Sequence, residues 1–227
     1  GMWHIQCNAT GGDCSSIGTW DSPTKTCTLT QDLNQGIIID SDGIVLDGNG
    51  RTITGNNTGS GAYLSGRAGV TIKNLNIQRF SQGIFLDGSS NIVLIGNTAT
   101  NSRVEIVIFR SNNNTLTGNT ASNSNPELGS DPDNDNIGIL LLSSSNNTIT
   151  NNVASNNFTG ILHSHSHNNT LSDNTVSNNS KGIDLSFSGD NNLTGNIVAS
   201  NSHEGILLSS SINNVLTDNT ISTNANG

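Results

Sequence analysis

Three of the five histidines in this chain of 227 residues stand at alternate positions, as His163, His165 and His167. Alternate residues of a strand face the same side, and imidazole nitrogens bind zinc, copper or nickel. The flanking sequence repeats, however, place Leu141 and Leu185 in the slot of His163, which is an inward position. A transition-metal site, with copper or zinc, and polar residues fitted at the end of a strand are therefore both open.

A second group with chemical potential is the acidic segment 125–136, which carries four carboxylates. Asp131, Asp133 and Asp135 stand at alternate positions, the spacing of the first three ligands in an EF-hand calcium loop. The match is partial, because the glycine and the final glutamate of such a loop are missing. Calcium binding and a solvated acidic loop both remain possible interpretations.

Arg103, Glu105 and Arg110 lie just before the acidic segment and are candidates for catalysis together with Asp131 and Asp133. A basic side chain beside carboxylates can remove a proton from a sugar acid and stabilise the charge that develops. The repeat slots one coil away show no acidic partner for either arginine. A lyase-like site is thus one interpretation of these five residues, and a purely structural role is the other.

These residues interrupt a sequence motif that recurs at intervals of about 22 residues. The motif combines Gly-Ile-x-Leu with Asn-Asn-Thr-Leu/Ile-Thr, and one interval is longer by about eleven residues. Alternating aliphatic residues predict short strands, and the Gly, Asn, Asp and Ser between them predict turns. Units this small bury a core only by stacking. We therefore predict an all-β solenoid, a parallel β-helix with three short strands in each coil of about 22 residues. Its second-strand aliphatic positions are Leu94, Leu116, Ile149, Leu171, Leu193 and Leu216.

One asparagine slot recurs in every coil after the one that holds Leu75 in that position. Stacked coils bring equivalent side chains to roughly 4.8 Å from one another, where amides can hydrogen-bond along the stack. We expect a structural ladder of Asn97, Asn119, Asn152, Asn174, Asn196 and Asn219. A second asparagine set comprises Asn101, Asn123, Asn156 and Asn178 and lapses to Ser200 and Thr223.

The repeat also places apolar residues at outward positions of one sheet. They form a column of Phe85, Val107, Leu140, Leu162 and Leu207. An apolar stripe on an exposed face commonly marks a contact surface. The column therefore favours a homodimer, and a covering segment of another kind is the alternative.

Charge and hydropathy exclude two classes of partner. The net charge is −9 with eight Lys and Arg residues in all, which argues against nucleic-acid binding. No stretch is long and apolar enough to predict insertion into a membrane.

Residues 1–35 differ in composition from 36–227 and are expected to form an N-terminal cap on the β-helix. The run from Cys14 to Cys27 reads as a hairpin that could bring these two cysteines together. Three cysteines allow one intramolecular bridge, and such a bridge indicates an oxidising compartment.

The repeated motif and the segment Ile44–Gly55 resemble NosD-type right-handed parallel β-helices of the wider pectin-lyase-like group, over about residues 36–227. The resemblance implies a right-handed coil and carbohydrate binding or hydrolysis, and NosD-type proteins are associated with copper-centre assembly. Similar alginate epimerases carry Asp-Pro-His-Glu, and the nearest string here, beginning at Asp131-Pro132, lacks the His and Glu. We expect a secreted, periplasmic or cell-surface module that recognises a polysaccharide or serves as a scaffold. A polysaccharide-processing enzyme and a NosD-like protein that handles copper or another metal are the alternatives.

Overall fold

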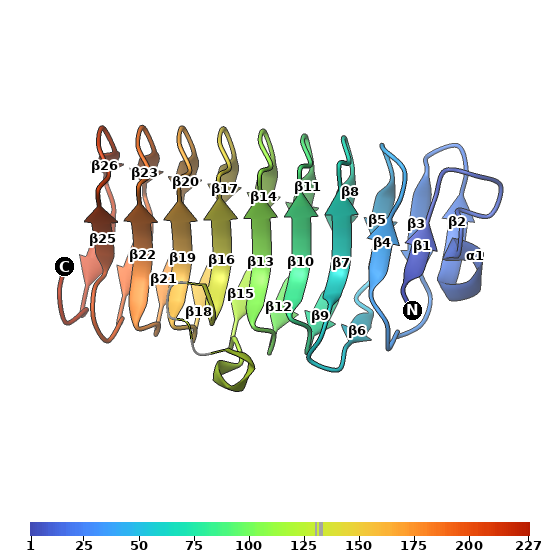
Figure 1. The fold of residues 1–227 in the computed structure, drawn as a ribbon, viewed down its shortest axis with the longest axis horizontal. Coiled ribbons are helices and arrows are strands. Elements are labelled where there is room, and N and C mark those ends of the chain that lie inside the picture. Colours follow the sequence, from blue (N-terminus) through green and yellow to red (C-terminus); the bar gives the residue numbers. More distant parts are fainter. Residues whose placement is uncertain (130, 132–133) are drawn as a thin grey trace.

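The computed structural model describes residues 1–129, 131 and 134–227. The chain winds into a solenoid in which each regular coil gives one strand to each of three sheets, with the two termini at opposite ends (Figure 1). Apart from one hairpin at the N-terminal end, neighbouring strands of the described chain pair in parallel. The predicted parallel β-helix is thus confirmed.

Sheet A supplies the face on which the candidate site lies. It contains nine strands, and those of the central coils are six residues long. Its strands in spatial order are β1 (Trp3–Ile5), β4 (Ile37–Ile39), β7 (Ser60–Ser65), β10 (Gln82–Asp87), β13 (Val104–Phe109), β16 (Ile137–Leu142), β19 (Thr159–Ser164), β22 (Lys181–Ser186) and β25 (Ile206–Ser209).

Sheets B and C complete the wall of each coil with strands of mostly three residues. Sheet B contains β2 (Gly18–Asp21), β3 (Thr26–Leu29), β5 (Val45–Asp47), β8 (Thr71–Lys73), β11 (Val93–Ile95), β14 (Thr115–Thr117), β17 (Thr148–Thr150), β20 (Thr170–Ser172), β23 (Asn192–Thr194) and β26 (Val215–Thr217). Sheet C contains β6 (Thr52–Thr54), β9 (Asn76–Gln78), β12 (Thr98–Thr100), β15 (Thr120–Ser122), β18 (Val153–Ser155), β21 (Thr175–Ser177), β24 (Ile197–Ala199) and β27 (Thr220–Ser222).

The core is a set of aliphatic columns inside the coils. In sheet B, Leu94 pairs with Leu116 and Leu116 with Ile149, and all three side chains are fully buried. Burying one such side chain contributes roughly 1.5–3 kcal/mol, so a single coil with its few aliphatic residues cannot fold alone. Stacking makes the core continuous. The column ends at Leu216, which is 41% exposed in the last coil.

Four polar ladders run along the same axis and satisfy the buried turns. Asn97 donates from its backbone N–H and from its Nδ2 to Asn119 Oδ1, both at 3.0 Å, and Nδ2 also donates to the Ile72 carbonyl at 2.9 Å. The expected asparagine ladder therefore has both side-chain groups of each amide in use. Two further buried asparagine ladders comprise Asn114, Asn147, Asn169, Asn191 and Asn214, and Asn157, Asn179, Asn201 and Asn224.

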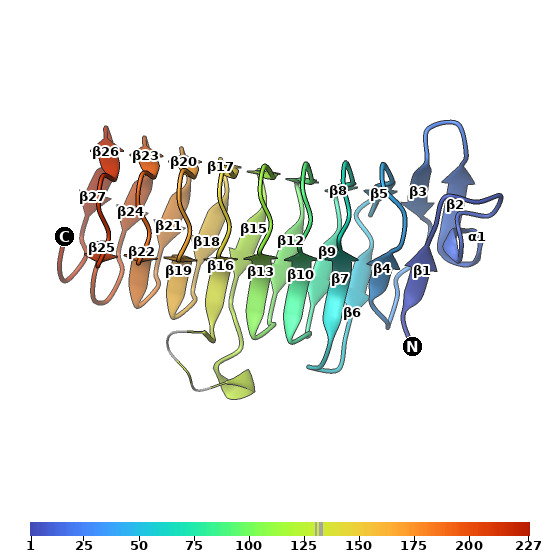
Figure 2. The same cartoon turned by 45° about the horizontal axis from the view of Figure 1, so that its top comes forward.

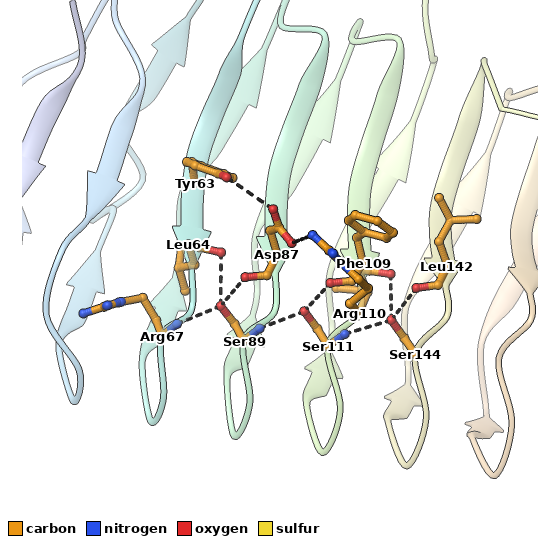
Figure 3. A network of polar contacts seen from close by, with 11 residues as sticks. Tyr63, Leu64, Arg67, Asp87, Ser89, Phe109, Arg110, Ser111, Leu142 and Ser144 are labelled. Carbon is orange, nitrogen blue, oxygen red and sulfur yellow. Dashed lines mark hydrogen bonds and ion pairs between the residues drawn. The ribbon is translucent and has the colours of Figure 1, made fainter.

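A serine ladder lies at the end of the sheet A strands, where the chain turns toward sheet B. Ser89, Ser111 and Ser144 lie in line along the axis (Figure 3). The Ser89 backbone N–H donates to Ser111 Oγ at 3.0 Å, and the Ser111 N–H donates to Ser144 Oγ at 3.1 Å. The pattern continues through Ser166, Ser188 and Ser211. The sequence did not predict this ladder, because serine is also an ordinary turn residue.

The second asparagine set serves a different purpose from a buried ladder. Asn101, Asn123, Asn156 and Asn178 are exposed and have φ between 56° and 58°. Asparagine tolerates this left-handed conformation better than most residues. These positions therefore shape the turns from sheet C toward sheet A, and Ser200 and Thr223 adopt the same conformation in the last coils.

The N-terminal cap contains the hairpin, the cysteine pair and the short helix α1 (Cys14–Ile17). Strands β2 and β3 pair antiparallel, and a disulfide joins Cys14 to Cys27, while Cys7 is free and exposed. The cap is continuous with the solenoid, since β1 pairs in parallel with β4 and β3 with β5. Helix α1 covers the end of the coils that would otherwise be open (Figure 1).

The insertion of the long repeat lies between β15 and β16 and contains the 3₁₀ turn η1 (Pro126–Leu128), which projects beyond the coils in both views (Figures 1 and 2). Its base is fastened to two consecutive residues of the preceding coil. The Asn125 N–H donates to the Ser102 carbonyl and the Asn136 N–H to the Arg103 carbonyl, both at 2.8 Å. The coil thus resumes in register, with Val104 opposite Ile137.

Candidate functional site

The outer face of sheet A departs most from the regularity of the repeat. Phe85 pairs with Val107, Val107 with Leu140 and Leu140 with Leu162, so the expected apolar column is one row of this face. The structure differs in one respect, because the three middle side chains are only 3% to 5% exposed. These three form an apolar cluster separate from the main core, called the outer apolar cluster below. Its other members are Val104 and Ile137, with Phe85, Phe109 and Leu142 packed against them.

The insertion is held against this face by an ion pair between Arg103 and Asp135. Arg103 Nε also donates to Ser81 Oγ at 3.2 Å, and Asp135 accepts from the Asp131 N–H at 3.0 Å. Both partners are largely shielded, with Asp135 only 7% exposed. Arg103 therefore neutralises a carboxylate that would be costly to bury alone.

Two hollows lie on this face, one on each side of Asn134, which lines both. The first, called the apolar hollow below, has a volume of about 260 Å³. It is walled by the outer apolar cluster, with Gln82, Arg103 and Asn134 as its polar lining. The second, called the polar hollow, has a volume of about 360 Å³ and lies over β19, β22 and β25.

The polar hollow combines a cation, a carboxylate and two flat rings. Lys181 Nζ lies 3.7 Å from Asp184 Oδ2. His165 and Phe187 stack with their ring centres 5.0 Å apart and their planes within 9°. The rest of the lining comes from Ser164, Ser186 and Ser209 together with Asn134, Leu162 and Leu207. The site therefore offers hydroxyl, charged and aromatic contacts within one open depression.

The two stacked rings stand at an unusual backbone position. His165 and Phe187 have φ of 50° and 49°, in the turn slot that Gly66 and Gly88 fill in earlier coils. A left-handed conformation costs a bulky residue free energy, and such positions often mark functional sites. Arg110 occupies the same slot with φ of 47°. The strained slots therefore place three large side chains along one edge of sheet A.

A second aromatic pair lies further toward the N-terminal end of the same face. The Tyr63 and Phe85 rings stack with centres 5.3 Å apart, and Tyr63 Oη donates to Asp87 at 3.4 Å. Asp87 in turn pairs with Arg110 at 3.2 Å, and Arg110 covers the Phe109 ring (Figure 3). Arg110 thus has an acidic partner one coil away, contrary to the expectation from the repeat slots.

Of the five catalytic candidates, Arg103, Glu105 and Arg110 are engaged by different partners, at Asp135, Ser102 and Asp87. Asp131 accepts a hydrogen bond from Asn134, and Asp133 lies outside the described residues. Glu105 is fully buried and occupies the slot of Gly83 and Gly138, so it does not face the outer surface. Burial raises the pKa of Glu105 to about 8, opposed by its hydrogen bonds from Ser102.

The three histidines also point in different directions, so the structure does not bring them together as the transition-metal interpretation requires. His163 faces the core between Leu141 and Leu185. Its two ring nitrogens have no hydrogen-bond partner among the described residues, and burial lowers its pKa to about 3. The strand ends at Ser164, and the left-handed turn at His165 breaks the alternation on which the prediction depended.

His167 is engaged by the next coil instead of by a neighbouring histidine. Its Nδ1 accepts a hydrogen bond from the Gly189 N–H at 2.9 Å. Of the predicted calcium ligands, Asp133 lies outside the described residues, and Asp135 is committed to Arg103. Asn134 donates to Asp131 at 2.8 Å. Within residues 1–129, 131 and 134–227 no three His, Cys, Asp or Glu side chains are grouped to hold a metal ion.

Two protein-family models match parts of the chain, each covering less than half of it. A family model described as right handed beta helix region matches residues 18–129, and one described as periplasmic copper-binding protein (NosD) matches residues 129–227. The fold of the chain is a parallel β-helix, in agreement with the description of the model that matches residues 18–129. No curated protein matches this β-helix in sequence.

Solved structures with the same fold include a mutant of the periplasmic alginate epimerase AlgG, with a TM-score of 0.61 and 16% identity over 86% of this chain. Pectate lyase Pel9A superposes with a TM-score of 0.61 and 12% identity over 89% of this chain. The chain spans 64% of the epimerase and 63% of the lyase. At these identities the likeness shows the fold alone. In the part of the β-helix that the structure describes, no helix is long and apolar enough to span a bilayer.

Proposed function

We propose that this β-helix recognises an acidic polysaccharide on the outer face of sheet A, with the polar hollow as its principal subsite. The observation that carries the proposal is the grouping of Lys181 and Asp184 with the stacked rings of His165 and Phe187. An ammonium group binds a sugar carboxylate, a carboxylate accepts hydrogen bonds from sugar hydroxyls, and flat rings pack against the apolar faces of sugars.

The distribution of positive charge supports an anionic ligand. The chain has only eight Lys and Arg residues against seventeen Asp and Glu. One of these basic residues, Lys181, nevertheless lies in the polar hollow, whereas Arg103 and Arg110 on the same face are paired with Asp135 and Asp87. At 3.7 Å the contact between Lys181 and Asp184 is longer than a hydrogen bond, so the ammonium keeps donors for a ligand. The solved neighbours named for alginate and pectate agree with this class of ligand.

The expected location is the periplasm, the cell surface or the medium. The Cys14–Cys27 disulfide supports this, because such bonds persist in oxidising compartments. The role proposed is recognition rather than copper handling, since the histidines of the second half do not converge.

Calorimetric titration with oligogalacturonate, oligoalginate and a neutral cello-oligosaccharide tests this function. We expect binding of an acidic oligomer, weakened about tenfold by Lys181→Ala and by Phe187→Asn, because each removes one group of contacts. Asparagine suits the left-handed backbone at 187. Lys73→Ala on sheet B is the matched control and should bind as the native chain does. Equal affinity for all three oligomers, or no effect of either variant, contradicts the proposal.

The same titrations are followed at the absorbance of unsaturated uronates, which a lyase releases. Binding without a rise in this absorbance is the expected result. A rise that Lys181→Ala abolishes would instead place a polysaccharide lyase in the polar hollow.

A further inference from the structure

We propose that the apolar hollow binds a short acyl substituent of the carbohydrate, so that the preferred ligand is an acylated acidic polysaccharide. This inference rests on the proposed function, because it assumes that sugar occupies the neighbouring polar hollow. It assigns a binding role to the outer apolar cluster, which the packing of the coils does not require.

The size of the apolar hollow fits a substituent and not a whole sugar chain. Pockets that enclose drug-sized ligands have volumes of roughly 300–1,000 Å³, and this hollow has about 260 Å³. Its walls are aromatic and aliphatic, with Phe85 and Phe109 beside Val107 and Leu140. Water gains few hydrogen bonds in such a space, so an alkyl group that displaces it is favoured.

The polar lining of the hollow selects a neutral group. Arg103 is already paired with Asp135, whose side chain is 10% exposed, so the local charge is balanced. The other polar side chains are the amides of Gln82 and Asn134. An ester carbonyl can accept a hydrogen bond from an amide. An ionised group would instead add a charge without a counterion in a hollow that holds little water.

A second copy of the chain fits this surface less well. Stable dimers bury about 800 Å² on each partner, but Val107, Leu140 and Leu162 are at most 5% exposed. The column that suggested a dimer is therefore largely covered within one chain. What remains open is a depression, which accepts a small group from solution.

The two hollows are placed for one ligand to occupy both. Asn134 forms a wall of both hollows. Strand β16 at the edge of the apolar hollow pairs with strand β19 at the edge of the polar hollow, with Leu140 opposite Leu162. A sugar in the polar hollow can thus direct an ester-linked chain past Asn134 into the apolar hollow. The insertion that carries Asn134 is then a specificity element rather than a decoration.

The test compares an oligogalacturonate with the same oligomer carrying hexanoyl esters, by calorimetric titration of the full chain. We expect the ester to bind at least tenfold more tightly to the native chain. Val107→Phe, which fills the hollow, should remove this gain and leave the affinity for the unesterified oligomer unchanged. Leu142→Ala, at the rim, should reduce the gain several-fold and covers the case in which Val107→Phe does not fold. Ile95→Phe, on the exposed face of sheet B, is the matched control and should retain the full gain.

The outcomes separate the two proposals. Equal affinity for both oligomers, with Lys181→Ala still weakening each, overturns the acyl site and leaves the proposed function standing. A gain that persists in both Val107→Phe and Leu142→Ala also overturns it, because the alkyl group then binds elsewhere. Absence of binding by the unesterified oligomer counts against the proposed function itself.

Discussion

Glu105 Oε1 accepts a hydrogen bond from the Ser102 backbone N–H at 2.9 Å, in a slot that glycine fills at Gly83 and Gly138. In the other coils this turn N–H bonds to the ladder side chain of the next coil, as Phe80 N–H does to Ser102 Oγ. Glu105 has thus replaced one rung of a ladder with its own carboxyl group. The consequence is a buried acid whose second oxygen has no partner among the described residues.

The raised pKa of Glu105 predicts that stability falls with increasing pH. The folded chain holds this proton up to about pH 8, while the unfolded chain releases it near 4.5, so the folded state binds more protons between these values. The stabilisation is complete below pH 4.5 and is lost as pH rises through 8, at up to about 1.4 kcal/mol per pH unit. Glu105→Gln should remove this slope in urea unfolding measured from pH 5 to 9. An unchanged slope in the variant means that another group is responsible.

His163 predicts the opposite dependence at acid pH. Its pKa is lowered from 6.5 to about 3, so the folded chain resists protonation and loses stability as pH falls through this window. His163→Leu matches the residues above and below it, Leu141 and Leu185. We expect the variant to be more stable by about 1–3 kcal/mol at pH 6, because two buried unpaired nitrogens are removed. Calorimetry at pH 4 and 6 checks this, and a less stable variant would show that the ring has a partner.

The asparagine ladder predicts that substituting a buried ladder asparagine lowers the free energy of unfolding far more than substituting an exposed turn asparagine. Asn152→Ala removes a buried amide that bonds to the Leu116 carbonyl and to Asn174, and we expect a loss of about 2–4 kcal/mol. Asn156→Gly, at an exposed left-handed turn, should change stability by less than about 0.5 kcal/mol. Both free energies come from denaturant titration. Similar losses in the two variants would argue against the ladder as the source of stability.

The ion pair between Arg103 and Asp135 predicts that the insertion opens when it is broken. Arg103→Ala leaves a buried carboxylate without its counterion, a loss of several kcal/mol in other proteins. Cleavage after the exposed Glu127 by a Glu-specific protease should accelerate at least about tenfold. Arg110→Ala is the control, because its pair with Asp87 lies on the same face and does not touch the insertion. Equal cleavage of both variants would remove Arg103 from this role.

The periodic features of the fold were predictable because the sequence repeats them. Leu94 and Leu116 stand 22 residues apart, and this spacing alone places them in contact in sheet B. The pairing of Cys14 with Cys27 followed from local hairpin spacing in the same way. The site residues occupy repeat slots, as His165 and Phe187 do, but their residue types do not repeat from coil to coil. Arg110 reaches back to Asp87 through a left-handed turn, and comparing one slot with the next cannot show such a contact.

The three histidines do not share the one face that strict alternation would give them, for a related reason. Strict alternation holds only within a strand, and the strand ends between His163 and His165 at Ser164. Sequence patterning does not fix such a boundary to one residue. The inward position of Glu105 was equally hidden, because Glu105 and its neighbour Ile106 are both fully buried, so the strand does not alternate between its two faces at this point.

The ladders give the solenoid a modular length. Each ladder amide receives its donors from the coil before it and gives its own backbone N–H to the coil after it, as Asn119 does between Asn97 and Asn152. Every internal coil therefore has the same two interfaces, and the insertion leaves them intact. Removing or duplicating one whole coil that does not line the polar hollow, such as residues 66–87, should preserve every class of hydrogen bond while changing the distance of the polar hollow from the N-terminal cap. The number of coils between the N-terminal cap and the polar hollow therefore sets the distance between them.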